Sequence, residues 1–178
     1  MTEVKRVKVL FDEAQIARRN TEIAIEIAAR KPKDLLVVAI LKGSFMFAAD
    51  LMRAMHHAGL MPQVEFIHLS SYRDSTVSSG HVEILKDVES DVRGRDVVLV
   101  DDILESGRTL AFAKDLMTAR GARVLTCCLL EKPGKSAVSI KADFVGFSCP
   151  DLFVVGYGMD VAHSYRQLPY VGVIETND

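Results

Sequence analysis

The sequence lacks most of the features that mark a specialised class of protein. Its 178 residues include only 3 cysteines, 5 prolines and no tryptophan. No run of about 18 or more apolar residues is present, which excludes a conventional transmembrane helix. Cys127, Cys128 and Cys149 show no CxxC or Cys/His spacing, so neither a disulfide framework nor a zinc site is expected. The histidines are also without metal-ligand spacing and are interpreted as surface or packing residues.

An excess of charge of one sign is missing as well. The 22 basic and 24 acidic residues give a net charge of −2, and no basic stripe is present. This balance gives no electrostatic reason to bind nucleic acid or an anionic membrane, so neither is expected as a partner. The polar stretch Met1–Lys8 lacks the apolar core of a signal peptide, and with the sparse cysteines it predicts a cytoplasmic protein.

What is present is an alternation of short apolar runs with helical stretches. Buried strands are predicted over Leu35–Leu41, Val64–Leu69, Val97–Val100 and Val124–Leu130. Helices are predicted over Phe11–Arg30, Phe45–Ala58 and Thr109–Arg120. This order indicates one α/β domain with a parallel sheet and right-handed crossovers. The stretch Lys141–Asp178 has no long helical pattern, and we expect it to supply the last strand and a small subdomain.

The strongest chemical signal lies where the third predicted strand ends. Asp101 and Asp102 follow that strand, and a short turn with Ser106, Gly107 and Thr109 leads into the next helix. Ligands of open α/β sheets bind outside the carboxyl ends of strands. The N–H groups of such a turn favour a phosphate, whereas carboxylates accept hydrogen bonds from sugar hydroxyls or bind a metal ion. The pattern predicts a site for a phosphorylated sugar; the plain alternative is a capped helix beside surface acids.

The stretch Val97–Leu110, VVLVDDILESGRTL, closely resembles the motif that binds 5-phosphoribosyl 1-diphosphate (PRPP) in the type I phosphoribosyltransferases. The resemblance implies that Asp101 and Asp102 hold the ribose hydroxyls. It also implies that the 5′-phosphate is held by Glu105, Ser106, Gly107, Arg108 and Thr109. The motif alone leaves the second substrate open, because it also occurs in pyrimidine-operon attenuator proteins and in orotate, adenine and xanthine enzymes.

Other segments, over roughly Leu36 to Val173, are similar to the bacterial-type hypoxanthine(-guanine) phosphoribosyltransferases. Lys42 and Gly43 match that family's pyrophosphate-binding loop, in which the Leu–Lys peptide can be cis. Arg166 matches an arginine that contacts pyrophosphate. Ser71 and Tyr72 begin a polar stretch that resembles the flexible lid of the family.

The purine side of the site is implied by the same resemblance. Lys132 falls where the family places the lysine that donates to the 6-oxo group. Phe153 matches the aromatic residue that stacks on the purine, and Val154 offers backbone groups to the purine edge. Asp160 matches an acidic residue of the purine hood that binds Mg²⁺ directly or through water, with Asp101 and Asp102 as further candidate ligands.

The resemblance therefore implies a type I phosphoribosyltransferase fold spanning residues 1–178, with a core of about 33–147. A hood subdomain is expected from about 148–178 together with part of the N-terminus. The implied reaction is transfer of the phosphoribosyl group of PRPP to N9 of hypoxanthine and/or guanine, with Mg²⁺ as cofactor and pyrophosphate as leaving group. The implied assembly is a homodimer or homotetramer.

The sequence departs from the family pattern at two acidic positions. Asp101 stands where the family usually has Glu. Glu105 stands where many members have an Asp that is proposed as the base for the purine N7 or N9 proton. Glutamate keeps the carboxylate but adds a methylene, so Glu105 either serves as this base or only shapes the loop.

Several other functions stay open on the sequence. A PRPP-dependent RNA-binding regulator of the attenuator type shares the Asp-Asp and Gly-Arg-Thr elements, although the negative net charge argues against it. A xanthine-preferring transferase is a second alternative, because the discriminating contact at C2 of the purine is mostly backbone. A pyrimidine-specific enzyme is disfavoured by Lys132 and Phe153, and a PRPP-binding sensor without activity is disfavoured by the intact acids and Lys42.

Overall fold

A computed structural model describes residues 6–71 and 81–175 of the chain. The helices are α1 (Glu13–Ala29), α2 (Phe45–His57) and α3 (Arg108–Ala119). The strands of the large sheet are β2 (Leu36–Leu41), β3 (Gln63–Ser71), β4 (Val82–Lys86), β5 (Asp96–Leu104), β6 (Arg123–Glu131) and β7 (Phe144–Ser148). A small sheet is formed by β1 (Val7–Phe11), β8 (Val154–Val155) and β9 (Val171–Ile174).

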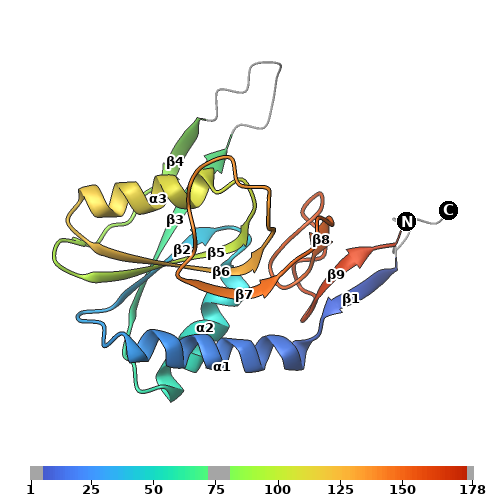
Figure 1. The fold of residues 1–178 in the computed structure, drawn as a ribbon, viewed down its shortest axis with the longest axis horizontal. Coiled ribbons are helices and arrows are strands. Elements are labelled where there is room, and N and C mark those ends of the chain that lie inside the picture. Colours follow the sequence, from blue (N-terminus) through green and yellow to red (C-terminus); the bar gives the residue numbers. More distant parts are fainter. Residues whose placement is uncertain (1–5, 72–80, 176–178) are drawn as a thin grey trace.

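The predicted α/β fold class is confirmed. The large sheet has the order β4-β3-β2-β5-β6-β7. The five adjacent strands β3, β2, β5, β6 and β7 are parallel to one another. The sequence predicted a parallel sheet, and this was wrong at one edge, where β4 pairs antiparallel with β3. The small sheet, with the order β1-β9-β8, lies at one end of the large sheet (Figure 1). Within the described residues, no helix is long and apolar enough to cross a membrane.

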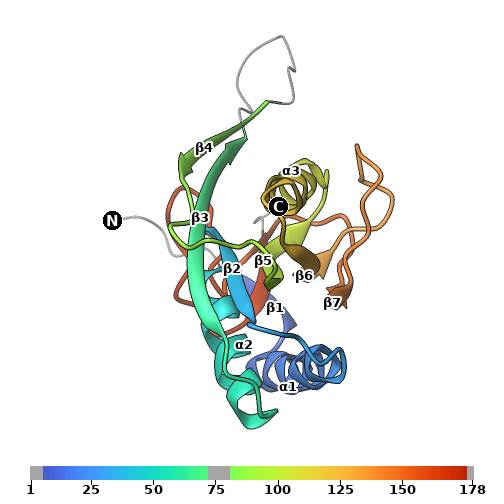
Figure 2. The same cartoon turned by 90° about the vertical axis from the view of Figure 1, so that its left-hand side faces the viewer.

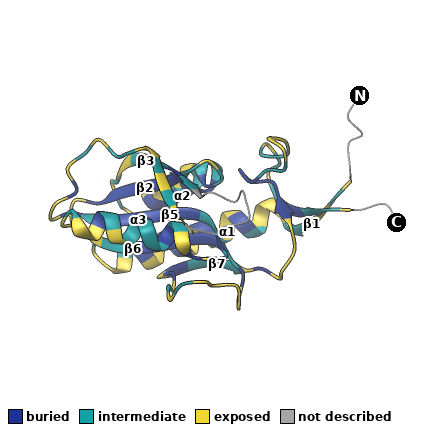
Figure 3. Cartoon of the chain, turned by 90° about the horizontal axis from the view of Figure 1, so that it is seen from above, coloured by how far each residue is buried: buried dark blue, intermediate teal, exposed yellow. Residues whose placement is uncertain are grey.

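The buried strands explain the layered arrangement, because successive side chains of a strand point to opposite faces of the sheet. In β2, Val37 and Ala39 belong to the core under α1 and α2, whereas Leu36 and Val38 belong to the core under α3. Helices α1 and α2 lie on one face and α3 on the other (Figures 1 and 2). Strands β2 and β5 are largely buried, as their dark blue colour in Figure 3 shows. Strands buried on both faces have continuous apolar sequences, which is why they could be located from sequence.

Local signals set the helix ends. Asp12 caps α1 through a hydrogen bond from the backbone N–H of Gln15, while the Gln15 side chain accepts from the Asp12 N–H. This capping box starts α1 after Phe11, so the predicted start at Phe11 was two residues early and Phe11 ends β1 instead. At the C-terminal end of α3, Gly121 has φ 90°, as expected for a glycine that closes a helix.

The sheet order places a topological switch between β2 and β5. From β2 the chain proceeds outward to β3, and from β5 it proceeds the other way to β6 and β7. Pairing of β2 with β5 ends at Ala39 and Val100, whereas β5 continues to pair with β6 as far as Leu104. Beyond Val100, β5 therefore has a neighbour on one side only. Such switch points at the carboxyl ends of strands are where ligands bind in open α/β sheets.

Candidate active site

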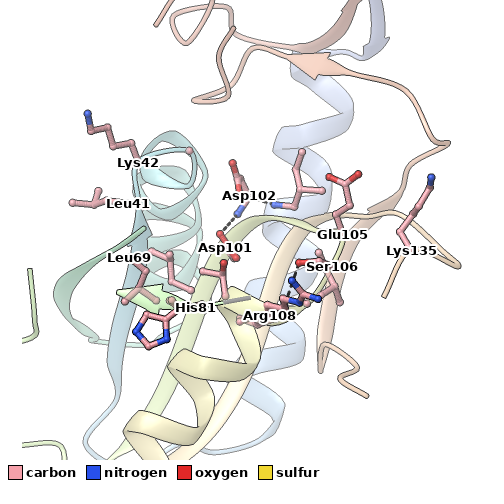
Figure 4. Close-up of a pocket in the computed structure, with 18 residues that line it drawn as sticks. Leu41, Lys42, Leu69, His81, Asp101, Asp102, Glu105, Ser106, Arg108 and Lys135 are labelled. Atoms are coloured by element: carbon pink, nitrogen blue, oxygen red, sulfur yellow. Dashed lines mark hydrogen bonds between the residues drawn. The ribbon is translucent and has the colours of Figure 1, made fainter. Parts of the chain in front are cut away.

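A cavity of about 590 Å³ opens at this switch point. Its walls are the loop after β2, the end of β5 and the turn between β5 and α3 (Figure 4). The predicted residues that line it are Lys42, Gly43, Asp101, Asp102, Glu105, Ser106, Gly107, Arg108 and Thr109. The parallel strands bring these loops together because their carboxyl ends lie at the same edge of the sheet.

Asp101 and Asp102 form the end of β5 and are held by short-range hydrogen bonds. The Asp102 N–H donates to Asp101 Oδ1 at 2.9 Å, and the Ile103 N–H donates to Asp102 Oδ1 at 2.8 Å. Asp101 is only 7% exposed. Burial, and after it the adjacent Asp102 carboxylate, raises the pKa of Asp101 well above its ordinary value. The Asp101 carboxylate is therefore costly to the unliganded fold, as is typical of functional groups rather than of stabilising ones.

The loop after β2 is packed directly on Asp102. A Cβ at Gly43 would overlap Asp102 Oδ2, so a side chain at this position would force the Asp102 carboxylate to move. The Leu41–Lys42 peptide is cis, as the resemblance implied. From the opposite side, a Cβ at Gly158 would meet the Gly43 carbonyl oxygen. The Lys42–Gly43 loop is thus enclosed between the β5 carboxylates and the segment that follows β8.

The turn between β5 and α3 has the properties of an anion site. Gly107 adopts the left-handed conformation with φ 77° and precedes Arg108, the first residue of α3. The N-cap residue Gly107 makes no side-chain cap hydrogen bond, and the Arg108 N–H donates to Ser106 Oγ only at 3.4 Å, so the first helical turn is weakly capped. Unsatisfied N–H groups and the positive end of a helix dipole both attract a phosphate. The Ala137 N–H donates to the Ser106 carbonyl at 2.8 Å and ties the turn to the segment after β6.

A second cavity of about 540 Å³ adjoins the first and shares Lys42, Gly43, Asp102 and Glu105 with it. Its remaining predicted residues are Lys132, Phe153, Val154, Asp160 and Arg166. The two cavities therefore form one continuous site, and every predicted site residue whose side chain the structure describes lines one or the other.

Several charged side chains in the second cavity form ion pairs. Lys132 is 8% exposed, and its Nζ lies 3.5 Å from Glu105 Oε1. Arg166 Nη2 lies 3.0 Å from Asp160 Oδ1, and Arg166 Nη1 donates to the Gly158 carbonyl at 2.6 Å. Phe153, in contrast, is 60% exposed. An exposed aromatic face beside a nearly buried lysine suits a flat ligand that stacks on the ring and accepts a hydrogen bond from the ammonium group.

Sequence reasoning missed several residues of the site. His81 lines the first cavity, near Leu69 in Figure 4, and lacked any sequence signal. Lys135 lines the first cavity and Asp151 lines the second, and their side chains form an ion pair at 2.6 Å. This pair could not be predicted because the two residues are far apart in the sequence. The predicted lid residue Tyr72 and the side chain of Ser71 lie outside the described residues.

Comparisons with known proteins agree with this geometry. A family model described as phosphoribosyl transferase domain matches residues 7–162. The hypoxanthine-guanine phosphoribosyltransferase of Bacillus subtilis is 42% identical over 170 residues, covering 94% of this chain and 93% of the relative. The hypoxanthine phosphoribosyltransferase of Escherichia coli is 41% identical over 172 residues, covering 94% and 95%. The crystal structure of a Staphylococcus aureus hypoxanthine phosphoribosyltransferase superposes with a TM-score of 0.88 at 37% identity, covering 94% and 91%.

The raised pKa of Asp101 predicts a pH-dependent gain in stability for Asp101→Asn. The unfolded chain loses the Asp101 proton at a lower pH than the folded chain, so this group destabilises the fold increasingly as pH rises above about 4. An uncharged Asn avoids this penalty and still accepts from the Asp102 N–H. Thermal unfolding of the unliganded proteins should show no advantage near pH 4 and a growing one toward pH 8.

The exposed Asp115→Asn on α3 is the matched control for that experiment. An Asp101→Asn advantage that stays flat or shrinks as pH rises would contradict the assignment of Asp101 as a destabilised carboxyl group.

Gly43→Ala tests the packing of the loop on Asp102. The added Cβ has to displace either the loop or the carboxylate, so we expect the affinity for PRPP, measured by calorimetry, to fall at least about tenfold. Gly59→Ala is the control, because a Cβ there meets open space although φ is +82°. It should cost about 1 kcal/mol of stability and leave PRPP binding unchanged. Equal PRPP affinities of Gly43→Ala and the parent would refute the close packing.

Proposed function

The chain belongs to the phosphoribosyl transferase domain family, and from this premise we propose that it is a purine-salvage hypoxanthine(-guanine) phosphoribosyltransferase. It transfers the 5-phosphoribosyl group of PRPP to N9 of hypoxanthine and/or guanine and gives IMP or GMP and pyrophosphate. The observation that carries the proposal is the continuous site itself. A buried Asp101, a half-buried Asp102 and a weakly capped helix N-terminus on one side adjoin an exposed Phe153 and a nearly buried Lys132 on the other.

The chemistry asks for positioning and charge stabilisation more than for a nucleophile. As the bond to pyrophosphate breaks, positive charge develops on the ribose and negative charge on the leaving group. The Asp101 and Asp102 carboxylates accept hydrogen bonds from the ribose hydroxyls and stabilise the positive charge. The 5′-phosphate lies on the N–H groups and side chains of Ser106 to Thr109. Holding both ends of the sugar fixes C1 of the ribose against the purine.

Pyrophosphate is bound on the other side of Asp102. Lys42 contributes a positive charge, and the Gly43 backbone can approach the phosphates closely because it carries no side chain. Arg166 adds a guanidinium whose planar donors match phosphate oxygens. These groups stabilise the negative charge of the leaving group and hold it for the reverse reaction.

The donor set fits Mg²⁺ that is bound largely through substrate. Asp160 is the candidate ligand, directly or through water, and Asp101 and Asp102 are further candidates. The described residues contain no group of three or more His, Cys, Asp or Glu side chains arranged around one point. Mg²⁺ is commonly held by one or two carboxylates together with substrate phosphates, which agrees with this arrangement. When bound, the ion neutralises charge on the pyrophosphate.

Purine recognition depends on the second cavity. Phe153 stacks on the ring, Val154 offers backbone groups to its edge, and Lys132 donates to the 6-oxo group. A 6-amino purine would place two donors face to face, so adenine is rejected. Glu105 lies beside Lys132 and is the candidate base for the purine proton, although its additional methylene changes how far the carboxylate reaches.

Assembly and location follow the family. We expect a homodimer or homotetramer and a cytoplasmic location. No nucleic acid is expected as a partner, because the net charge is −2. A filter-binding assay with RNA separates this proposal from an attenuator-type regulator, which would retain RNA in a PRPP-dependent manner.

The direct test of the activity is a spectrophotometric assay with PRPP and Mg²⁺ against hypoxanthine, guanine, xanthine, adenine and uracil. We expect turnover with hypoxanthine or guanine and none with adenine or uracil. A preference for xanthine would make the chain a xanthine-preferring transferase. Absence of turnover with every 6-oxopurine would overturn the proposal.

Lys132→Ala tests the basis of purine specificity. Loss of the only donor assigned to the 6-oxo group should raise KM for hypoxanthine about a hundredfold, whereas the affinity for PRPP should change by less than about threefold. Lys141→Ala, in the same segment but exposed, is the control and should match the parent. An equal loss of hypoxanthine and PRPP affinity would contradict the assigned role.

A further inference from the structure

A hydrogen-bonded chain outside the assigned site, with buried Tyr157 and Asn20 and a partly exposed Asp50, joins three segments that are far apart in the sequence. Tyr157, in the turn after β8, is 5% exposed. Its hydroxyl donates to Asp50 Oδ2 on α2 at 2.6 Å and accepts from Asn20 Nδ2 on α1 at 3.0 Å. Both helices and the turn are therefore held by one phenol oxygen, to which no role has yet been assigned.

The backbone of this turn shows that Tyr157 is specifically placed. Tyr157 has φ 50°, a left-handed conformation that is uncommon for a residue with a side chain, and glycines with positive φ stand on both sides of it. Its N–H donates to the Leu168 carbonyl at 2.9 Å. Phenylalanine would fill the same volume, so the hydroxyl is present for its hydrogen bonds. Burial and the bond to Asp50 raise the pKa of Tyr157, which keeps the hydroxyl a donor.

On one side, the turn forms part of the pyrophosphate side of the site. Its next residue, Gly158, lies against the Gly43 carbonyl so closely that a Cβ could not fit between them. The Gly158 carbonyl accepts from Arg166 Nη1, and the Gly158 N–H donates to the Arg166 carbonyl at 3.0 Å. Arg166 in turn pairs with Asp160. A shift of the turn would therefore move Arg166 and Asp160 relative to the Lys42–Gly43 loop.

On the other side, the chain leads back to that same loop. Asp50 lies on α2, and α2 begins at Phe45, directly after the loop and Ser44. The Ser44 hydroxyl donates to the Ile40 carbonyl at 2.6 Å and fixes the loop to the end of β2. The Tyr157–Asp50 bond therefore joins the helix that carries one wall of the pyrophosphate site to the turn that carries the other.

We propose that the Tyr157 hydroxyl is a positioning group that sets the spacing between the Lys42–Gly43 loop and the Asp160–Arg166 pair, and thereby the affinity for pyrophosphate. This inference rests on the proposed function and extends it to a residue outside the substrate contacts. Asn20 completes the arrangement by donating to the phenol oxygen, which then has a fixed direction in which to donate to Asp50.

Tyr157→Phe is the primary test, because it removes the hydroxyl at nearly constant volume. We expect KM for PRPP and the inhibition constant of pyrophosphate to rise about tenfold. The affinity for IMP, which contains no pyrophosphate, should stay within about twofold of the parent. Tyr170→Phe is the control, since the Tyr170 hydroxyl makes no hydrogen bond within the described residues, and it should change neither affinity.

The split between the two ligands separates positioning from a general structural role. A fall of pyrophosphate and IMP affinities by the same factor, or no fall in either, overturns the proposal. Asp50→Ala should reproduce the selective loss, and Asp50→Asn, which keeps an acceptor oxygen, should restore most of it. The double variant Tyr157→Phe/Asp50→Ala should be no weaker for pyrophosphate than the weaker single variant, whereas additive losses would show independent effects and overturn the proposal.

Failure of the inference and failure of the proposed function give different results. If the parent chain transfers the phosphoribosyl group but Tyr157→Phe binds pyrophosphate normally, only the positioning role is wrong. If the parent transfers to no 6-oxopurine, the proposed function is wrong, whatever the outcome of the binding measurements.

Discussion

Two neighbouring carboxylates held at the end of a buried strand are the constraint on which this site depends. Strand β5 loses its neighbour β2 after Val100, and Asp101 and Asp102 follow immediately. Without a ligand, Asp101 is buried beside a like charge, which is unfavourable. In the proposed function a ribose offers hydroxyl donors to these acceptors, so the free energy lost in the empty fold would be recovered in the complex. The buried Asp101 beside Asp102 therefore makes the empty site destabilising and, in the proposed function, favours a ligand with sugar hydroxyls.

The rest of the site is arranged around these acids by close packing. A Cβ at Gly43 would displace the Asp102 carboxylate, and a Cβ at Gly158 would overlap the Gly43 carbonyl oxygen. The absence of these two side chains lets the loop after β2 lie against Asp102 and the turn after β8 lie against that loop. The Tyr157 hydroxyl, which donates to Asp50 on α2 and accepts from Asn20 on α1, connects the turn after β8 to both helices from outside the cavity. The pyrophosphate side of the site is thus assembled from elements distant in sequence, whereas the phosphate turn at Ser106 to Thr109 is local.

That difference explains which parts could be predicted from sequence. The central stretches of β2, β5 and β6 are apolar, apart from Thr126, because both faces of the sheet are covered. The turn at Gly107 was predictable because its residues lie in one contiguous motif. The small sheet was not predicted, because Val7 pairs with Ile174 and neither segment has a pattern of its own. Strand β4 was missed because it is a short edge strand with exposed side chains. The Lys135–Asp151 and Tyr157–Asp50 contacts depend on tertiary placement, which a single sequence does not reveal.

The central claim is that the carboxylates of β5 and the turn after it bind the two ends of one ribose phosphate. A crystal structure of the chain with IMP tests this most directly. The account predicts the ribose hydroxyls within hydrogen-bond distance of Asp101 and Asp102, the phosphate on the N–H groups of Ser106 to Thr109, and the purine between Phe153 and Lys132. A nucleotide bound elsewhere, or bound here with its phosphate away from that turn, would contradict it.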